Sequence, residues 1–427
     1  MCTMARTFYP VGQGAFYSEE FREASGNVVF RIVYDCGSLR WCKLQPKRDG
    51  AKLYRGEIER RVEKAFTDEH GIDLLFISHL DDDHVNLIEH LEPFKKRNHI
   101  RRVVLPLLNT KERFILTGYC LLSNWLRKDK KRSDSLCRFL NDPKDYFRSC
   151  EKIVFVRPYD SEGDYAKENG NSVSIDELPD SIASFTEITV GKKQSRGGGM
   201  SLGNWVFVPY NHQPKRFEGL EELLKDAFMT KKTKFCLEML KDVGFVTKNL
   251  KVLRRCYKKL KEGINRNSMA LYSGPVDRPD AWSAVDIEGS DDRWIGCYLN
   301  QMPEYCVKCS ATSKSPFAVG APSAFLNRPG CLYTGDLSLN DAQLSTHFRR
   351  YDKCIGTVQL PHHGSQDSFG DGDLPIAGRV CVATYGECNI FGHPALSVKR
   401  DVARKDGFWI DVTELEESQF KVEYKIG

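Results

Sequence analysis

The sequence predicts a layered α/β domain built on two β-sheets. Apolar runs typical of strands occur in both halves of the chain, and each half also contains segments with helical periodicity. Several of these runs stop directly at His and Asp residues, and functional side chains of layered α/β proteins commonly follow strand ends. We therefore expect a two-sheet domain with a functional site where the strands end.

The composition is that of an ordinary globular protein. Of the 427 residues, 41% are hydrophobic and 28% are charged, so the chain can bury a substantial core, and its net charge of +5 permits an anionic partner. No apolar run approaches the roughly 20 residues that cross a bilayer, and residues 1–10 lack the apolar stretch of a signal peptide. The 15 cysteines are scattered, with one C-x-x-C pair at Cys306 and Cys309. We expect a cytoplasmic protein without a membrane segment.

The first fifty residues predict a β-hairpin. Residues 6–9 lead into the glycine turn Val11-Gly12-Gln13-Gly14, and residues 28–34 form a second run rich in β-branched and aromatic side chains. This second run ends at Asp35-Cys36-Gly37. Residues 54–66 combine helical periodicity with many charges, which predicts an exposed amphipathic helix.

The next predicted strand, residues 72–77, ends at a dense group of imidazoles and carboxylates. His79, Asp81, Asp83 and His84 fall within six positions. Such side chains are costly to bury unless they are paired or bind a metal, and this donor set suits Zn, Mn or Fe. The alternative interpretation is an acidic surface turn.

The middle of the chain is mostly helical and basic in pattern. Between residues 211 and 262 there are 14 Lys and Arg against 7 Asp and Glu, a local net charge of +7. Basic residues with an interleaved aromatic can hold a phosphate backbone and stack on a base, whereas the alternative is a solvated helix face. The residues concerned are Arg254, Arg255, Tyr257, Lys258 and Lys259.

Three predicted strands of the C-terminal part also end at polar residues. Each of these residues alone has a simple structural explanation, such as a helix cap or a surface turn. Together with the group at residues 79–84, they indicate one shared metal site. The strands and the residues that follow them are 330–334 with Asp336, 355–360 with His362 and His363, and 380–385 with His393.

These motifs, taken in order, resemble the metallo-β-lactamase superfamily, in the ComEC-like branch with Asp as the middle ligand of the first motif. They frame nearly the whole chain, so we expect a single domain over residues 1–427, with residues 107–262 as a largely helical, basic insertion. The motifs are Val11-Gly12-Gln13-Gly14, Asp35-Cys36-Gly37, His79-Leu80-Asp81-Asp82-Asp83-His84, Asn267-Ser268, Thr334-Gly335-Asp336, His362-His363-Gly364-Ser365 and Gly392-His393-Pro394.

The resemblance implies a four-layer αββα sandwich with two divalent metal ions, Zn or Mn, between the ends of the sheets. It also implies a ligand set. His79 and Asp81 would hold the first ion, Asp83, His84 and His393 the second, and Asp336 would bridge both.

Further roles follow from the same resemblance. Asp35 would orient a metal ligand by a hydrogen bond. His362 or His363 would either complete the ligand set of the first ion or donate a proton to the leaving oxygen. The third histidine common for the first ion has no clear counterpart, and His212 is the candidate for it.

We therefore expect a metal-dependent phosphodiester hydrolase in which two metals activate a water, with Asp83 in the catalytic group and DNA as substrate. One alternative is a small-molecule phosphodiesterase acting on a cyclic nucleotide or phosphoester. Another is a non-catalytic subunit that uses the helical insertion to bind a protein partner.

Overall fold

The computed structural model describes most of the chain. Asn267, Cys306 and Cys309 lie outside the described residues. The described ranges are 3–39, 55–95, 99–127, 137–159, 171–191, 202–212, 219–230, 234–259, 268–277, 282–288, 327–340, 342–370 and 373–426.

The first sheet has nine strands and is mixed. Its antiparallel part, β12-β17-β1-β2-β3, joins the two ends of the chain, and the strands from β3 through β4, β5 and β6 to β8 run parallel. The strands are β1 (Thr3–Phe8), β2 (Phe16–Arg22), β3 (Val28–Cys36), β4 (Ile72–Phe76), β5 (Ile100–Pro106), β6 (Lys152–Val156), β8 (Ser181–Ile182), β12 (Trp282–Glu288) and β17 (Phe420–Ile426).

The second sheet has eight strands in the order β16-β15-β14-β13-β11-β10-β9-β7. Strands β13 to β16 run parallel, and β11 and β10 are antiparallel to their neighbours. The strands are β7 (Ser172–Ser174), β9 (Glu187–Thr189), β10 (Trp205–Asn211), β11 (Met269–Pro275), β13 (Gly330–Tyr333), β14 (Ile355–Gln359), β15 (Val380–Thr384) and β16 (Phe408–Val412).

Alternation along the strands places one side of each sheet against the other sheet. In β4, Leu74 and Phe76 belong to the core between the sheets, whereas Leu75 packs on the outer side. In β10, Phe207 contributes to the same central core and Val206 to the outer core of the second sheet. The two sheets therefore pack face to face as a sandwich.

Helices cover the outer face of each sheet. The first sheet packs against α1 and α2, and the second against α11, α12 and α13, so the predicted layered α/β class is confirmed. The described helices include α1 (Arg55–Lys64), α2 (Asp82–Val85), α3 (Glu92–Lys95), α4 (Thr110–Arg127), α6 (Pro143–Tyr146), α7 (Leu220–Met229), α8 (Val243–Tyr257), α11 (Leu344–His347), α12 (Gln366–Phe369) and α13 (Leu396–Arg404).

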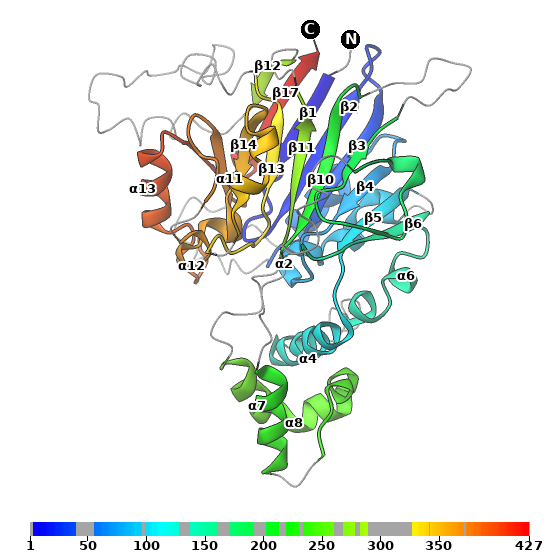
Figure 1. Cartoon of the computed structure of the whole chain (residues 1–427), viewed down its shortest axis with the longest axis vertical. Helices are drawn as coiled ribbons and strands as arrows, with labels where there is room; N and C mark the ends of the chain where they lie inside the picture. Colours follow the sequence, from blue (N-terminus) through cyan, green and yellow to red (C-terminus); the bar gives the residue numbers. More distant parts are fainter. Residues whose placement is uncertain are drawn as a thin grey trace.

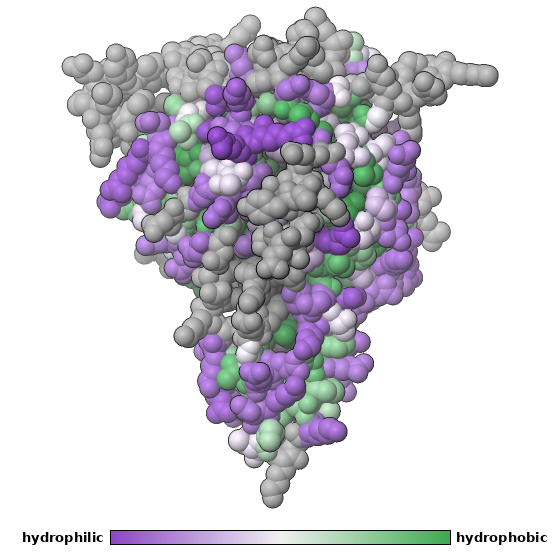
Figure 2. Space-filling model, in the orientation of Figure 1, coloured by the Kyte–Doolittle hydropathy of each residue, from purple (hydrophilic) through white to green (hydrophobic). Residues whose placement is uncertain are grey.

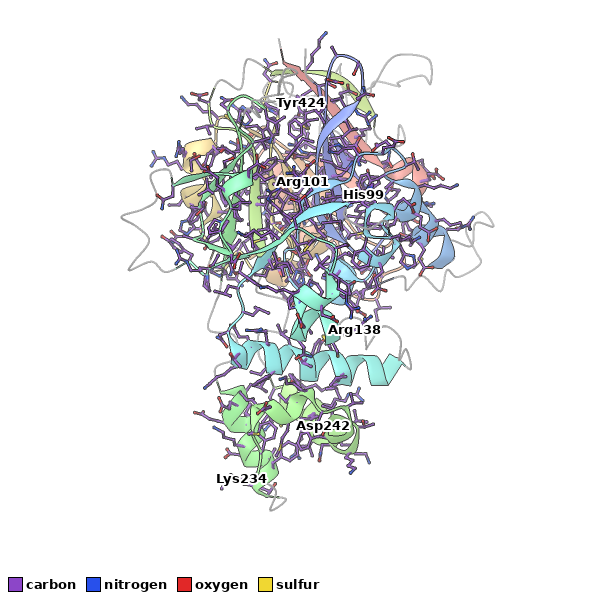
Figure 3. All side chains as sticks on the ribbon, turned by 90° about the vertical axis from the view of Figure 1, so that its right-hand side faces the viewer. His99, Arg101, Arg138, Lys234, Asp242 and Tyr424 are labelled. Carbon is purple, nitrogen blue, oxygen red and sulfur yellow. The ribbon has the colours of Figure 1, made fainter. Side chains whose placement is uncertain are left out.

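A helical unit formed by α4, α7, α8 and the 3₁₀ helix Leu237–Lys241 projects from one end of the sandwich (Figure 1). Figure 3 shows Lys234 and Asp242 in this unit and Tyr424 at the opposite end of the molecule. The expected single insertion over residues 107–262 is wrong in one respect. Strands β6 to β10 lie inside that range and belong to the two sheets, so the unit is assembled from two separate segments.

No helix in the described part of the chain is long and apolar enough to cross a membrane.

Strand β12 lies in the region after residue 275, where the sequence indicated only a long loop, and it pairs with β17 at the edge of the first sheet.

A fully buried ion pair lies in the core between the sheets. Arg6 and Glu19, both 0% exposed, are 2.7 Å apart. Tyr333 and Ser273 of the second sheet donate hydrogen bonds to the same carboxylate. Charges at this depth are tolerated because each has its opposite charge beside it.

We predict that Arg6→Met destabilises the protein by about 3–5 kcal/mol, because it leaves the Glu19 charge buried without its cation. Urea unfolding monitored by circular dichroism measures this change. The double variant Arg6→Met/Glu19→Leu should lose less stability than the single variant. A double variant at least as unstable as the single one would contradict this account.

Candidate metal centre

The loop after β4 carries the first part of the site. Strand β4 ends at Phe76, and His79 and the short helix α2 follow within a few residues. Asp83 and His84 lie on α2 and are buried, with 7% and 1% exposure. Figure 1 shows α2 at the end of the sheets from which the helical unit projects.

Glycines hold this loop close to the first sheet. A Cβ on Gly37 would lie 2.4 Å from the carbonyl carbon of Asp83, and one on Gly14 would lie 2.3 Å from the Gly37 oxygen. The amide of Ala15 donates to the Asp83 carbonyl at 3.1 Å, which fixes the backbone at α2. The glycine motifs of the sequence therefore position a ligand loop by allowing backbones to approach closely.

Asp336 enters from the second sheet on a tight turn after β13. Gly335 has a φ of +54°, and a Cβ there would lie 2.2 Å from the hydroxyl of Ser268. That hydroxyl accepts a hydrogen bond from the Asp336 amide at 3.0 Å. Behind the turn, the side-chain oxygen of Gln359 accepts from the amides of Thr334 and Gly335.

The histidine pair after β14 lies on an unusual backbone. His362 and His363 have φ values of 47° and 56°, a left-handed conformation that is uncommon outside glycine. The His362 amide donates to the Gly335 carbonyl at 3.0 Å, so this turn is tied to the one that carries Asp336. Strain of this kind persists only where the surrounding structure enforces it.

Four buried side chains from the two sheets converge on one point. Asp83, His84, Asp336 and His363 each place a ligand atom within 4.8 Å of the others. His84 Nε2 lies 3.0 Å from Asp336 Oδ1, and His363 Nε2 lies 3.3 Å from Asp83 Oδ2. Ligands about 2.0–2.1 Å from a tetrahedral ion lie roughly 3.3 Å from one another, so the group has the spacing of a metal site.

The second oxygen of Asp336 faces a different pair of imidazoles. Asp336 Oδ2 lies 3.6 Å from His362 Nε2 and 3.8 Å from His79 Nε2. Asp336 is thus flanked by His84 and His363 at one oxygen and by His79 and His362 at the other.

Hydrogen bonds behind the cluster orient its imidazoles. Nδ1–H of His84 donates to Asp35 Oδ2 at 2.7 Å, and Nδ1–H of His363 donates to the Thr384 carbonyl at 2.7 Å. Each hydrogen bond leaves the Nε2 lone pair directed at the cluster, the arrangement typical of metal-binding histidines. Asp35 is held in turn by the Ser78 amide and hydroxyl, at 2.7 and 2.6 Å.

The polar atoms at the centre fit a cation. Within the described residues, neither oxygen of Asp336 nor Nε2 of His84 has a hydrogen-bond partner, although the atoms are buried. The 3.0 Å approach between them lacks hydrogen-bond geometry. Buried atoms of this kind in native proteins normally have a partner, and two imidazoles with two carboxylates suit Zn, Mn or Fe.

The electrostatics show how strongly the site favours positive charge. Burial lowers the pKa of His84, but the carboxylates of Asp336 and Asp35 outweigh it and raise this pKa well above its ordinary value. Burial raises the pKa of Asp336, yet the surrounding imidazoles, that of His362 first, hold it well below its usual value. For Asp35, burial dominates and raises the pKa.

The predicted site residues can now be placed. Asp83, His84 and Asp336 meet as expected, and His363 joins them in the position assigned from sequence to His393. The ring of His393 lies 6.4 Å from that of His363 and outside the group of four. Asp81 immediately precedes α2 and is not a member of the group either.

His212, the candidate for the third histidine of the first ion, directly follows Asn211 of β10, which pairs with Met269 next to Ser268. It is not among the four clustered side chains. Its Nδ1 lies 3.0 Å from the hydroxyl of Tyr210, a residue of the outer core of the second sheet. His362 Nε2 is the imidazole atom nearest to Asp336 Oδ2, at 3.6 Å, and that of His79 follows at 3.8 Å.

The predicted nucleic-acid residues lie on and just after α8, in the helical unit. Arg254, Arg255, Lys258 and Lys259 are exposed. The assignment of Tyr257 as a base-stacking residue is wrong, because it is 6% exposed and its hydroxyl donates to the Ile115 carbonyl at 2.7 Å. The ring lies with Leu253, four residues earlier, on the inward face of the helix.

Sequence reasoning missed the residues that support the ligands. Ser78, Gln359 and the Thr384 carbonyl hold ligand loops but are not ligands. Ser78 directly precedes His79, and Gln359 ends the strand that leads to the histidine pair. The sequence signal that could have identified Ser78 and Gln359 as supporting residues is their position: each is a polar residue at the end of a buried strand, just before a predicted ligand.

Comparisons with known proteins identify no relative. No protein-family model matches the chain, and a search of curated proteins finds no match.

We predict that Gly37→Ala disturbs the loop that carries Asp83 and His84. The new methyl group cannot fit 2.4 Å from the Asp83 backbone, so stability should fall by about 1–3 kcal/mol and metal uptake should weaken. Gly56→Ala in α1 is the matched control, since nothing lies within 4 Å of its Cβ position. Thermal unfolding with and without Mn²⁺ measures both effects, and equal metal uptake in the two variants would contradict the prediction.

Proposed function

We propose that the protein is a metal-dependent phosphodiester hydrolase that acts on nucleic acid. The buried cluster of Asp83, His84, Asp336 and His363, with imidazoles oriented from behind, carries this proposal. The order of its motifs along the chain, which resembles metallo-β-lactamase superfamily hydrolases, supports the reaction class.

The residues divide between two neighbouring metal positions. Asp83, His84 and His363 would hold one ion together with Asp336 Oδ1. His79 and His362 would hold a second next to Asp336 Oδ2. Divalent ions in such a pair lower the pKa of a bound water and stabilise the charge of a phosphodiester.

The chain's own groups have defined tasks in this scheme. Asp35 fixes the tautomer and direction of His84 through its 2.7 Å hydrogen bond with Nδ1. His362, with 27% of its side chain exposed, lies at the edge of the cluster, and Ser368 Oγ contacts its Nδ1 at 2.8 Å. This exposure marks the side of the cluster from which a phosphodiester would approach out of solvent.

The helical unit supports nucleic acid as the substrate. Lys251, Arg255 and Lys258 recur at intervals of four and three residues after the kink at Asn249, so they share one exposed face of this part of the α8 region. Lys248, before the kink, is also exposed. With Arg254 and Lys259 they form what we call the basic stripe. Figure 2 shows mainly hydrophilic residues over the described surface of the sandwich, with hydrophilic and hydrophobic residues mixed on the unit below it.

We predict that the purified protein binds Mn²⁺ or Zn²⁺ and hydrolyses bis-p-nitrophenyl phosphate, and that Asp336→Asn abolishes both. Removing this carboxylate deprives both metal positions of a ligand. Asp35→Asn should lower metal affinity by about 10–100-fold, because it removes only the orienting hydrogen bond. Calorimetric titration measures binding, and Asp401→Asn, at a partly exposed position of α13 outside the cluster, is the control. Undiminished metal binding by Asp336→Asn would refute the assigned site.

A second prediction concerns the basic stripe. Replacing Arg254, Arg255, Lys258 and Lys259 by Ala should weaken DNA binding and reduce the slope of log K against log salt by about 0.7–0.9 for each phosphate that is no longer neutralised. Alanine at Arg349, Lys353, Arg404 and Lys405 removes the same charge from another surface and serves as the control. If both variants show the same slope, the stripe is only a solvated helix face.

A further inference from the structure

The loop between β15 and α13 exposes large apolar side chains beside the metal centre. Ile390 is 91% exposed, Phe391 53% and Leu396 61%. Six large hydrophobic residues are exposed in the described part of the chain, and three of them fall within these seven positions. Isolated exposed apolar residues are ordinary, but a local group of them marks a contact surface.

The loop is held in shape by its own hydrogen bonds. The side-chain oxygen of Asn389 accepts from the amides of Phe391 and His393, at 3.1 and 3.0 Å. The side-chain nitrogen of the same residue donates to the carbonyls of Gly386 and His393, at 2.7 and 2.6 Å. Ile390 and Phe391 are therefore displayed at the tip of an organised turn.

A row of rings connects this tip to the metal centre. Phe391 lies nearly parallel to His393, at an interplanar angle of 15° and a centroid distance of 5.9 Å. The ring of His393 is 5.3 Å from that of His362, and His362 Nε2 is 3.6 Å from Asp336 Oδ2. A substrate group attached to a phosphate at the centre would pass directly along this row.

We propose that Phe391, with Ile390 beside it, is a stacking platform for an unpaired nucleobase, which makes single-stranded nucleic acid the substrate class. This inference rests on the proposed function. An exposed aromatic ring next to a phosphate-binding centre is a general way to hold single strands, because every base has a stacking face.

The dimensions favour a base over a protein partner. A stable protein interface needs about 800 Å² on each partner, far more than a few side chains on one turn provide. A base, in contrast, is about the size of one aromatic ring. A base within a duplex is already stacked on its neighbours, so the platform selects unpaired strands.

The experiment compares two fluorescein-labelled strands of equal length, an oligothymidylate and one made of abasic residues. Binding is measured by anisotropy in EDTA, where metal-dependent cleavage does not occur. Phe391→Ala should weaken binding of oligothymidylate about tenfold, within the range expected for removing one base–aromatic stack, and leave the abasic strand unchanged. In Phe391→Trp, the added indole fluorescence should be quenched by oligothymidylate only.

Phe408→Ala is the matched control. Phe408 is 37% exposed at the start of β16, whereas the metal centre lies beyond the ends of the parallel strands. Phe391→Tyr should retain binding because it keeps the ring. Equal weakening for both strands, weakening in the control, or no binding of oligothymidylate by the parent protein would overturn the inference.

Different results would refute the proposed hydrolase function and the proposed stacking platform. A parent protein that does not hydrolyse bis-p-nitrophenyl phosphate with added Mn²⁺ refutes the hydrolase. A protein that hydrolyses it but binds oligothymidylate equally well with and without the Phe391 ring refutes the platform alone.

Discussion

The carboxylate of Asp336 is the group on which the arrangement of the centre depends. It is 1% exposed and projects from the second sheet toward His79 and His84 of the first. An ionised carboxylate at this depth is stable only when cations or imidazoles surround it. The loops of both sheets therefore have to deliver positive or metal-binding groups to the same point, and this requirement explains why so much of the chain's polar chemistry gathers there.

The residues that satisfy this requirement are largely not ligands. Gly37 lets the backbone of Asp83 approach more closely than a Cβ would permit, and Gly335 does the same for the side chain of Ser268. The Ser78 hydroxyl donates a hydrogen bond to the carboxylate of Asp35, and the Ser268 hydroxyl accepts one from the Asp336 amide. A centre built in this way is organised before a cation arrives, because its loops are held by hydrogen bonds and packing against the two sheets.

Two surface features extend the centre in different directions. The helical unit projects from the end of the sandwich where α2 lies, and it carries exposed positive charge at helical spacing. The turn at Ile390 and Phe391 instead offers apolar, aromatic surface beside the histidines. In the proposed function, charge of the first kind would contact a nucleic-acid backbone without regard to sequence, whereas the ring would contact single bases.

Most strands and the polar residues at their ends could be predicted from the sequence, because period-two burial and abrupt polar stops are local signals. Strands β2 and β12 were not predicted. The sequence also determined that Asp83, His84 and Asp336 meet. Which imidazoles join them depends on how the folded loops turn. His363 turns inward on a left-handed backbone while His393 remains outside, and spacing along the chain says nothing about the direction of a loop. The same holds for the helical unit, since packing between distant segments assembles it and buries the ring of Tyr257.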